Sequence, residues 1–164
     1  MGLIDLLFWN VDTQHDFVSP NGKLYVREAV NLKPVWAELT KLAKEKSVRV
    51  VNTADWHHYN SADLDVSPDF VHSFPEHCIA NSKGAESVNE TRPENPVVFD
   101  WETEKQICPG ITDIEKSRNY IVIESPANVF KGNNLTETVL ELLNPENVVV
   151  YGVTTNVCVD AAVM

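Results

Sequence analysis

The segment Val150–Asp160, VYGVTTNVCVD, passes from apolar residues to Thr and Asn and then to a cysteine. A short apolar run that gives way to polar residues is typical of a buried strand followed by a helix. Cys158 would then lie at a helix N-terminus, where free N–H groups lower the pKa of a thiol. The alternative interpretation is that Cys158 is only a small apolar residue of the core.

Other short apolar runs share this character, which predicts a sheet. Nearly continuous apolar segments, without the alternation of a half-exposed strand, are typical of parallel strands covered on both faces. The predicted strands are Leu3–Val11, Val48–Asn52, Tyr120–Ile123 and Val148–Val153, with Val97–Phe99 as a further candidate.

Two segments have helical spacing. Pro34–Lys46 follows Asn31 as the expected N-cap, and Leu135–Leu143 follows Asn134, with Glu137 completing a capping box. The apolar stripe of the first helix is predicted at Val35, Leu39, Leu42 and Ala43. Strands that alternate with helices predict an α/β fold, whose ligands bind beyond the carboxyl ends of the strands. The segment Tyr59–Lys116 is predicted to consist of long connecting loops, except for the strand candidate within it.

Composition limits the functional classes. The 164 residues are expected to form one domain, 1–164, and the net charge of −11 argues against nucleic acid or an anionic membrane as a partner. A small neutral or cationic partner fits better. The chain shows neither a membrane span nor a signal peptide, and its three cysteines have no CxxC spacing, so we expect a cytoplasmic protein with free thiols.

Polar residues follow three of the predicted strands and should meet at one edge of the sheet. Asp12 ends the first strand, where a buried acid must be paired, functional or capping a turn. In DWHH, Asp55 and His57 are two residues apart and point to the same side of an extended segment. His77, in FPEHC, would complete a set of three N and O ligands with open positions, as in a catalytic metal site.

The remaining histidines are expected to have other roles. We predict that His58 and His72 are exposed loop residues. His15 could contact a ligand, but its position before Phe17 in the first loop favours a role in a turn.

Taken together, these segments resemble the isochorismatase-like cysteine hydrolases, and among them the nicotinamidase and pyrazinamidase branch. The similar motifs occur in the family's order over essentially the whole chain. They are VDTQHDF (Val11–Phe17), DWH (Asp55–His57), FPEHCIANSKGAE (Phe74–Glu86), NVFKGNNL (Asn128–Leu135) and VYGVTTNVCV (Val150–Val159).

The resemblance implies a three-layer α/β/α sandwich and hydrolysis of the C–N bond of a small amide. Cys158 matches the family's nucleophile and Asp12 its acid/base. Asp55, His57 and His77 match the ligands of a divalent metal (zinc, iron or manganese), which polarises a water and holds the substrate's ring nitrogen. A cis peptide bond before Thr154 is implied, with the Thr154 and Cys158 N–H groups forming an oxyanion hole. Phe17 and Phe74 would stack on the ring, and the resemblance also suggests a homo-oligomer.

Two features depart from the family pattern. Glu124 stands where the family has a lysine, and a carboxylate there should raise the pKa of Asp12 and of the thiol. The given sequence also ends six residues after Cys158, whereas the family continues through at least one more strand and helix, so we expect the native protein to be longer or the remaining portion to be supplied by another route. Glu124 leaves two alternatives open: a silent ligand-binding domain, or a hydrolase of another substrate such as an N-carbamoyl compound or isochorismate.

Overall fold

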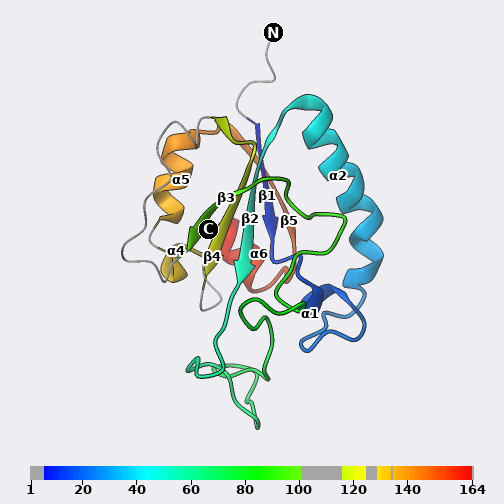
Figure 1. Ribbon diagram of the computed structural model, residues 1–164, viewed down its shortest axis with the longest axis vertical. Coiled ribbons are helices and arrows are strands. Elements are labelled where there is room, and N and C mark those ends of the chain that lie inside the picture. Colours follow the sequence, from blue (N-terminus) through cyan, green and yellow to red (C-terminus); the bar gives the residue numbers. More distant parts are fainter. Residues whose placement is uncertain (1–5, 101–115, 125–128, 134, 164) are drawn as a thin grey trace.

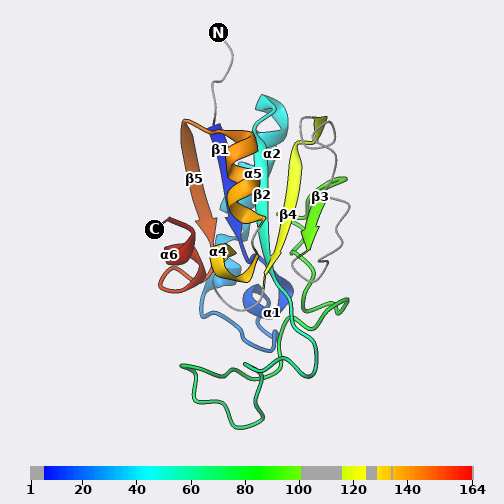
Figure 2. The same ribbon diagram turned by 90° about the vertical axis from the view of Figure 1, so that its left-hand side faces the viewer.

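The structure is a computed structural model that describes residues 6–100, 116–124, 129–133 and 135–163. Its centre is a sheet of five strands, all parallel, in the order β3-β4-β2-β1-β5. Figure 2 shows the five strands side by side. They are β1 (Leu6–Val11), β2 (Arg49–Asp55), β3 (Val97–Asp100), β4 (Asn119–Glu124) and β5 (Asn147–Gly152). The parallel sheet expected from the apolar runs is therefore confirmed, although residues 3–5 lie outside the described part. The prediction that every strand is covered on both faces was wrong for the edge strand β5, where Val148 and Val149 are 42% and 40% exposed.

Helices cover both faces of the sheet, which gives three layers (Figure 1). The helix α2 (Lys33–Lys46) packs on one face; α4 (Val129–Gly132), α5 (Thr136–Leu143) and α6 (Cys158–Val163) lie on the other. Successive residues of β1 pack on opposite faces of the sheet. Leu7 and Trp9 belong to the core on the α5 side, whereas Phe8 packs with Ala43 of α2. The expected α/β/α sandwich is confirmed.

The predicted start and buried face of α2 were partly wrong. Asn31 belongs to the 3-10 helix η1 (Ala29–Leu32), which runs directly into α2, so Leu32 occupies the N-cap position without a side-chain cap. Trp36 and Ala43 are the buried residues of α2, whereas Val35 and Leu42 are 58% and 41% exposed. The indole ring of Trp36 decides which face of α2 is buried, since it is the largest apolar group of the helix.

The N-terminus of α5 lies one residue later than predicted. The N-cap position of α5 is Leu135, which has no side-chain cap, and Asn134 lies outside the described residues. Asn133 instead accepts a hydrogen bond from the Leu135 backbone N–H, and the Thr136 hydroxyl donates to the Asn133 carbonyl. The turn before α5 is thus stabilised by the asparagine one position earlier than predicted.

The carboxyl ends of the strands all lie at one end of the molecule, together with α1 (His15–Val18) and the long segment between β2 and β3 (Figure 1). Residues 56–96 form no helix or strand; isolated bridges pair His57 with Ile79 and Leu64 with Phe74 within the segment, and a further bridge pairs Ser87 with Gln14. This confirms long loops as far as residue 96; residues 101–115 lie outside the described part. Among the described helices, none has the length and apolar character needed to cross a membrane.

Candidate active site

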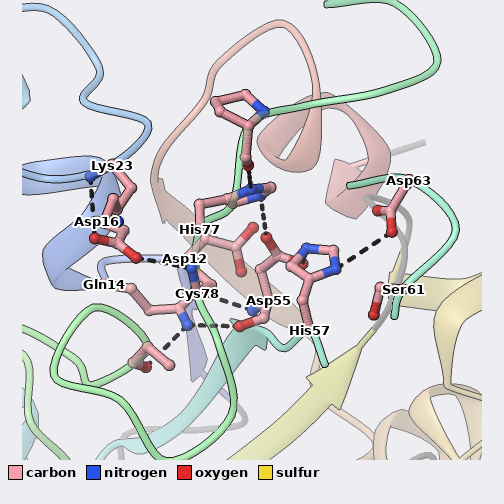
Figure 3. Close-up of polar contacts among 12 residues, drawn as sticks. Asp12, Gln14, Asp16, Lys23, Asp55, His57, Ser61, Asp63, His77 and Cys78 are labelled. Carbon is pink, nitrogen blue, oxygen red and sulfur yellow. Dashed lines mark hydrogen bonds and ion pairs between the residues drawn. The ribbon is translucent and has the colours of Figure 1, made fainter. Parts of the chain in front are cut away.

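Three predicted side chains meet just beyond the end of β2. Asp55 is the last residue of that strand, His57 follows two residues later, and His77 comes from the long loop. The Nε2 atom of His57 lies 2.8 Å from Asp55 Oδ1, and that of His77 lies 2.9 Å from Asp55 Oδ2. All three side chains are buried, and one ligand atom from each falls within 4.8 Å of the other two (Figure 3).

The contacts inside this trio determine its charge. Burial by itself would raise the pKa of Asp55, but its contacts with His57 and His77 outweigh burial and hold the pKa below its usual value. Burial would lower the pKa of His77, yet the neighbouring Asp55 carboxylate raises it above the usual value. The site therefore favours an ionised carboxylate between two imidazoles.

The same atoms fit a divalent metal. Although His57 Nε2 and Asp55 Oδ1 are close, neither atom has a hydrogen-bond partner with acceptable geometry among the described residues. Buried polar atoms that lie close together without hydrogen-bonding one another destabilise the fold unless another bound group satisfies them. Two imidazole nitrogens and a carboxylate oxygen are a donor set that suits zinc, iron or manganese.

Gln14 fixes the position of Asp55. Its side-chain amide donates to the Asp55 carbonyl at 2.7 Å, and its Oε1 accepts from the Asp55 backbone N–H at 2.9 Å. The same amide also donates to the Ala85 carbonyl at 2.9 Å. The buried side chain thus joins the end of β2 to the loop between β2 and β3.

The loop that carries His77 is held by backbone pairing and by Asp16. The His57 N–H donates to the Cys78 carbonyl at 3.0 Å, and Asp16 Oδ2 accepts from the Cys78 N–H at 2.8 Å. Gly84 packs directly on the Asp16 carboxylate, and a Cβ at residue 84 would overlap it. These contacts bring His77 to Asp55 across 22 residues of sequence.

Asp12 lies at the end of β1 and is fully buried. Its backbone has a positive φ of 48°, and its Oδ1 accepts a short hydrogen bond from the Thr53 hydroxyl. The backbone N–H of Asp12 in turn donates to Thr53 Oγ1 at 3.2 Å. β2 thus fixes the orientation of this carboxyl group.

Cys158 is the first residue of α6 and is half-buried. It lies beyond the end of β5, after a cis peptide bond between Val153 and Thr154, as the family resemblance implied. Cys158 also contacts the apolar core of the α5 side. Cys158 nevertheless lines a pocket of about 550 Å³ that it shares with Asp55, His57 and His77.

Most of the pocket wall is apolar or aromatic. Phe17 and Phe74 both line it, with ring centroids 5.5 Å and 6.1 Å from that of His77. Thr154 also lines the pocket, as do residues that sequence reasoning did not single out: Leu24, Tyr25, Val26, Asp63, Val71, Val153, Asn156 and Val157.

The other residues singled out in the sequence have different surroundings. The ring of His15 contacts the Ser19 hydroxyl at 3.0 Å within α1, which agrees with a role in a turn. His58 is exposed; the His72 side chain is 85% exposed, lies at the edge of the pocket and pairs with Asp69. Glu124 ends β4 in register with Asp55, but the structure does not describe its side chain.

Sequence comparison assigns the family. The isochorismatase domain model matches residues 6–164. The chain belongs to the isochorismatase family. No curated protein sequence matches this chain.

Several solved structures share this fold. This isochorismatase-family chain is 26% identical to the pyrazinamidase of Pyrococcus horikoshii, solved in complex with zinc, with a TM-score of 0.71 over 96% of this chain and 75% of that one. The nicotinamidase/pyrazinamidase of Bacillus subtilis is 22% identical, with a TM-score of 0.69 over 98% and 78%. The N-carbamoylsarcosine amidase of Thermoplasma acidophilum is 17% identical, with a TM-score of 0.67 over 96% and 73%. At the lower two identities the likeness shows the fold alone.

Proposed function

We propose that this protein is a metal-assisted cysteine amidohydrolase that releases ammonia from a small uncharged carboxamide such as nicotinamide, through a thioester on Cys158. The observation that carries the proposal is one shared pocket. A cysteine at the start of a helix and a buried Asp-His-His trio line the same 550 Å³ space. A nucleophile and a group that suits a metal then face a single bound substrate.

The proposed reaction begins with proton transfer from Cys158 to Asp12. The thiolate adds to the carboxamide carbon, and the backbone N–H groups of Thr154 and Cys158 stabilise the oxyanion. Asp12 returns the proton to the leaving nitrogen, ammonia departs and a thioester remains. Water then cleaves the thioester, with Asp12 accepting its proton, which releases the carboxylic acid and restores the thiol.

Asp55, His57 and His77 would hold the divalent metal. When bound, it supplies a Lewis acid for the substrate and for water. The three side chains come from a strand end and a loop that are both tied by buried hydrogen bonds, so their separation is fixed before the metal binds.

The charge of the pocket favours an uncharged substrate. Among the described residues no lysine or arginine lines the pocket, while two carboxylates, Asp55 and Asp63, do. A substrate that carries its own carboxylate, such as N-carbamoylsarcosine or isochorismate, would find no lysine or arginine side chain among the described lining residues to pair with, which costs binding energy. An aromatic amide between Phe17 and Phe74 has no such cost.

Ammonia release by purified, zinc-loaded protein tests the proposal. We expect release from nicotinamide and none from Cys158→Ala, whereas Cys108→Ala serves as the control for loss of a cysteine. We also expect kcat/KM for N-carbamoylsarcosine to be lower than that for nicotinamide. Absence of ammonia release from nicotinamide with metal supplied would contradict the amidase assignment.

A silent ligand-binding domain is the second candidate, because Glu124 replaces the family's lysine and ends the strand next to β2, in register with Asp55. This candidate predicts that nicotinamide raises the Tm without any turnover. Replacement of Glu124 by lysine separates the enzyme from the silent domain. If the wild type releases no ammonia and Glu124→Lys does, the result would support the silent domain.

A further inference from the structure

Asp63 faces the second ring nitrogen of His57. Its Oδ1 lies 3.4 Å from His57 Nδ1, whereas the other nitrogen, Nε2, is the one beside Asp55 (Figure 3). His57 is only 1% exposed, and Nδ1 has no hydrogen-bond partner with acceptable geometry among the described residues. Because a buried ring N–H needs an acceptor, the nearby carboxylate is the group placed to provide one.

His77 shows the same arrangement with a different acceptor. Its Nδ1 donates to the Pro75 carbonyl at 2.7 Å, and its Nε2 lies 2.9 Å from Asp55 Oδ2. In both imidazoles, therefore, Nε2 faces Asp55 and Nδ1 faces an oxygen on the side of the ring away from Asp55. The acceptor for His77 is backbone, and the acceptor for His57 is a side chain that a substitution can remove.

The backbone of Asp63 is fixed independently of its carboxylate. The Phe74 N–H donates to the Asp63 carbonyl at 2.8 Å, and the Asp65 N–H donates to the Phe74 carbonyl at 2.9 Å. These bonds fasten the loop around Asp63 to the segment that carries Phe74. The carboxylate, 22% exposed, can approach His57 without any change in that pairing.

We propose that Asp63 is a positioning residue whose carboxylate accepts the Nδ1–H of His57 and so keeps Nε2 directed at the metal. This inference rests on the metal site of the proposed function. Asp63 is not a direct ligand, because it lies on the opposite side of the ring from Asp55. Imidazole ligands commonly donate their second N–H to a carboxylate, and loss of that partner typically weakens metal binding by about 10–100-fold.

Zinc affinity provides the test. The chelator-treated protein is titrated with zinc in competition with a chromophoric chelator, for the wild type, Asp63→Ala, Asp63→Asn and the control Asp65→Asn. Asp65 is an exposed acid of the same loop, and its carboxylate accepts a hydrogen bond from the Ser67 N–H. We expect the zinc Kd to rise by about 10–100-fold in Asp63→Ala, by less in Asp63→Asn, and not at all in Asp65→Asn.

A second readout reports the ring itself. Long-range ¹H–¹⁵N spectra of the zinc-loaded protein should show a His57 Nδ1–H that exchanges slowly with solvent in the wild type and faster in Asp63→Ala. A wild-type zinc Kd in Asp63→Ala, or an equal loss in Asp65→Asn, overturns the inference. If Asp63→Ala does not fold, Asp63→Asn decides, and an unchanged Kd there overturns the inference as well.

The outcomes also separate this inference from the proposed activity. A wild type that binds no zinc contradicts both. A wild type that binds zinc, binds it more weakly in Asp63→Ala and releases no ammonia supports the role of Asp63 and contradicts the amidase.

Discussion

Cys78 and Cys158 differ in their surroundings. Cys78 is fully buried, and burial together with the charges of Asp55 and Asp16 raises the pKa of its thiol well above the usual value. Cys158 is half-buried and lines the pocket. We therefore expect a mild electrophile at neutral pH to modify Cys158 and leave Cys78 unmodified, as peptide mass spectrometry would show. If the electrophile modified Cys78 and left Cys158 unmodified, the roles assigned to the two cysteines would be wrong, and the silent ligand-binding domain would be favoured.

Gln14 illustrates how one side chain positions another. In Gln14→Ala, the backbone N–H and carbonyl of Asp55 both lose their side-chain partner inside the protein. We expect the free energy of unfolding to fall by about 2–3 kcal/mol, since unsatisfied buried groups cost more than the net value of a hydrogen bond. Urea denaturation measures this change. The comparison is Gln14→Glu, which keeps the acceptor for the Asp55 N–H. An equal loss of unfolding free energy in the two variants would mean that the amide donor of Gln14 makes the stabilising contribution.

At the scale of the elements, the end of β5 depends on Gly152. Its φ is +134°, and a Cβ at this position would collide with the backbone of Val11 in the neighbouring strand. We expect Gly152→Ala to lower the free energy of unfolding by at least about 1–3 kcal/mol, because backbone strain alone costs that much. The matched control is Val149→Ala, a 40% exposed position of the same strand. Equal stability of Gly152→Ala and wild type in urea would refute this.

The turn at residues 69–73 is organised by one carboxylate. Asp69 accepts hydrogen bonds from the backbone N–H groups of Val71, His72 and Ser73, which lower its pKa well below the usual value. Because the folded-state pKa is depressed, Asp69 stabilises the turn above the unfolded pKa of 3.8, and this contribution is lost as the pH falls toward the folded value. Carboxyl ¹³C shifts followed by NMR should show Asp69 still ionised at pH 3.8, and half-protonation there would contradict the turn geometry.

At the scale of the whole molecule, metal binding should be linked to stability. The trio joins the end of β2 to the long loop, and such a site is absent from the unfolded chain. Zinc at about 100 times its Kd adds roughly 2.7 kcal/mol to the free energy of unfolding. For a domain of this size the Tm should rise by about 5–10 °C in a thermal melt. Asp55→Asn should abolish most of the rise, and an equal rise in that variant would place the zinc elsewhere.

The strands, and the edge of the sheet at which the candidate site residues lie, were predictable because they depend on short-range patterns in the sequence. Apolar runs such as Val48–Asn52 specify buried parallel strands, and parallel strands bring their carboxyl ends together. Asp12, Asp55 and Cys158 therefore all follow the carboxyl ends of strands, as connectivity alone requires. The face of α2 was less predictable, since Val35 and Trp36 are both apolar and only the shape of the core distinguishes them.

The sequence by itself determined the family, the sheet and the types of group that the site contains, since each is encoded in residues close together along the chain. Only the tertiary structure decided how Gln14 and Asp16 hold the site and that Asp63 faces the outer nitrogen of His57. The physical reason is that residues 56–96 have no repeating hydrogen-bond pattern. The path of such a loop is set by individual buried polar contacts with distant segments, which no local spacing reveals.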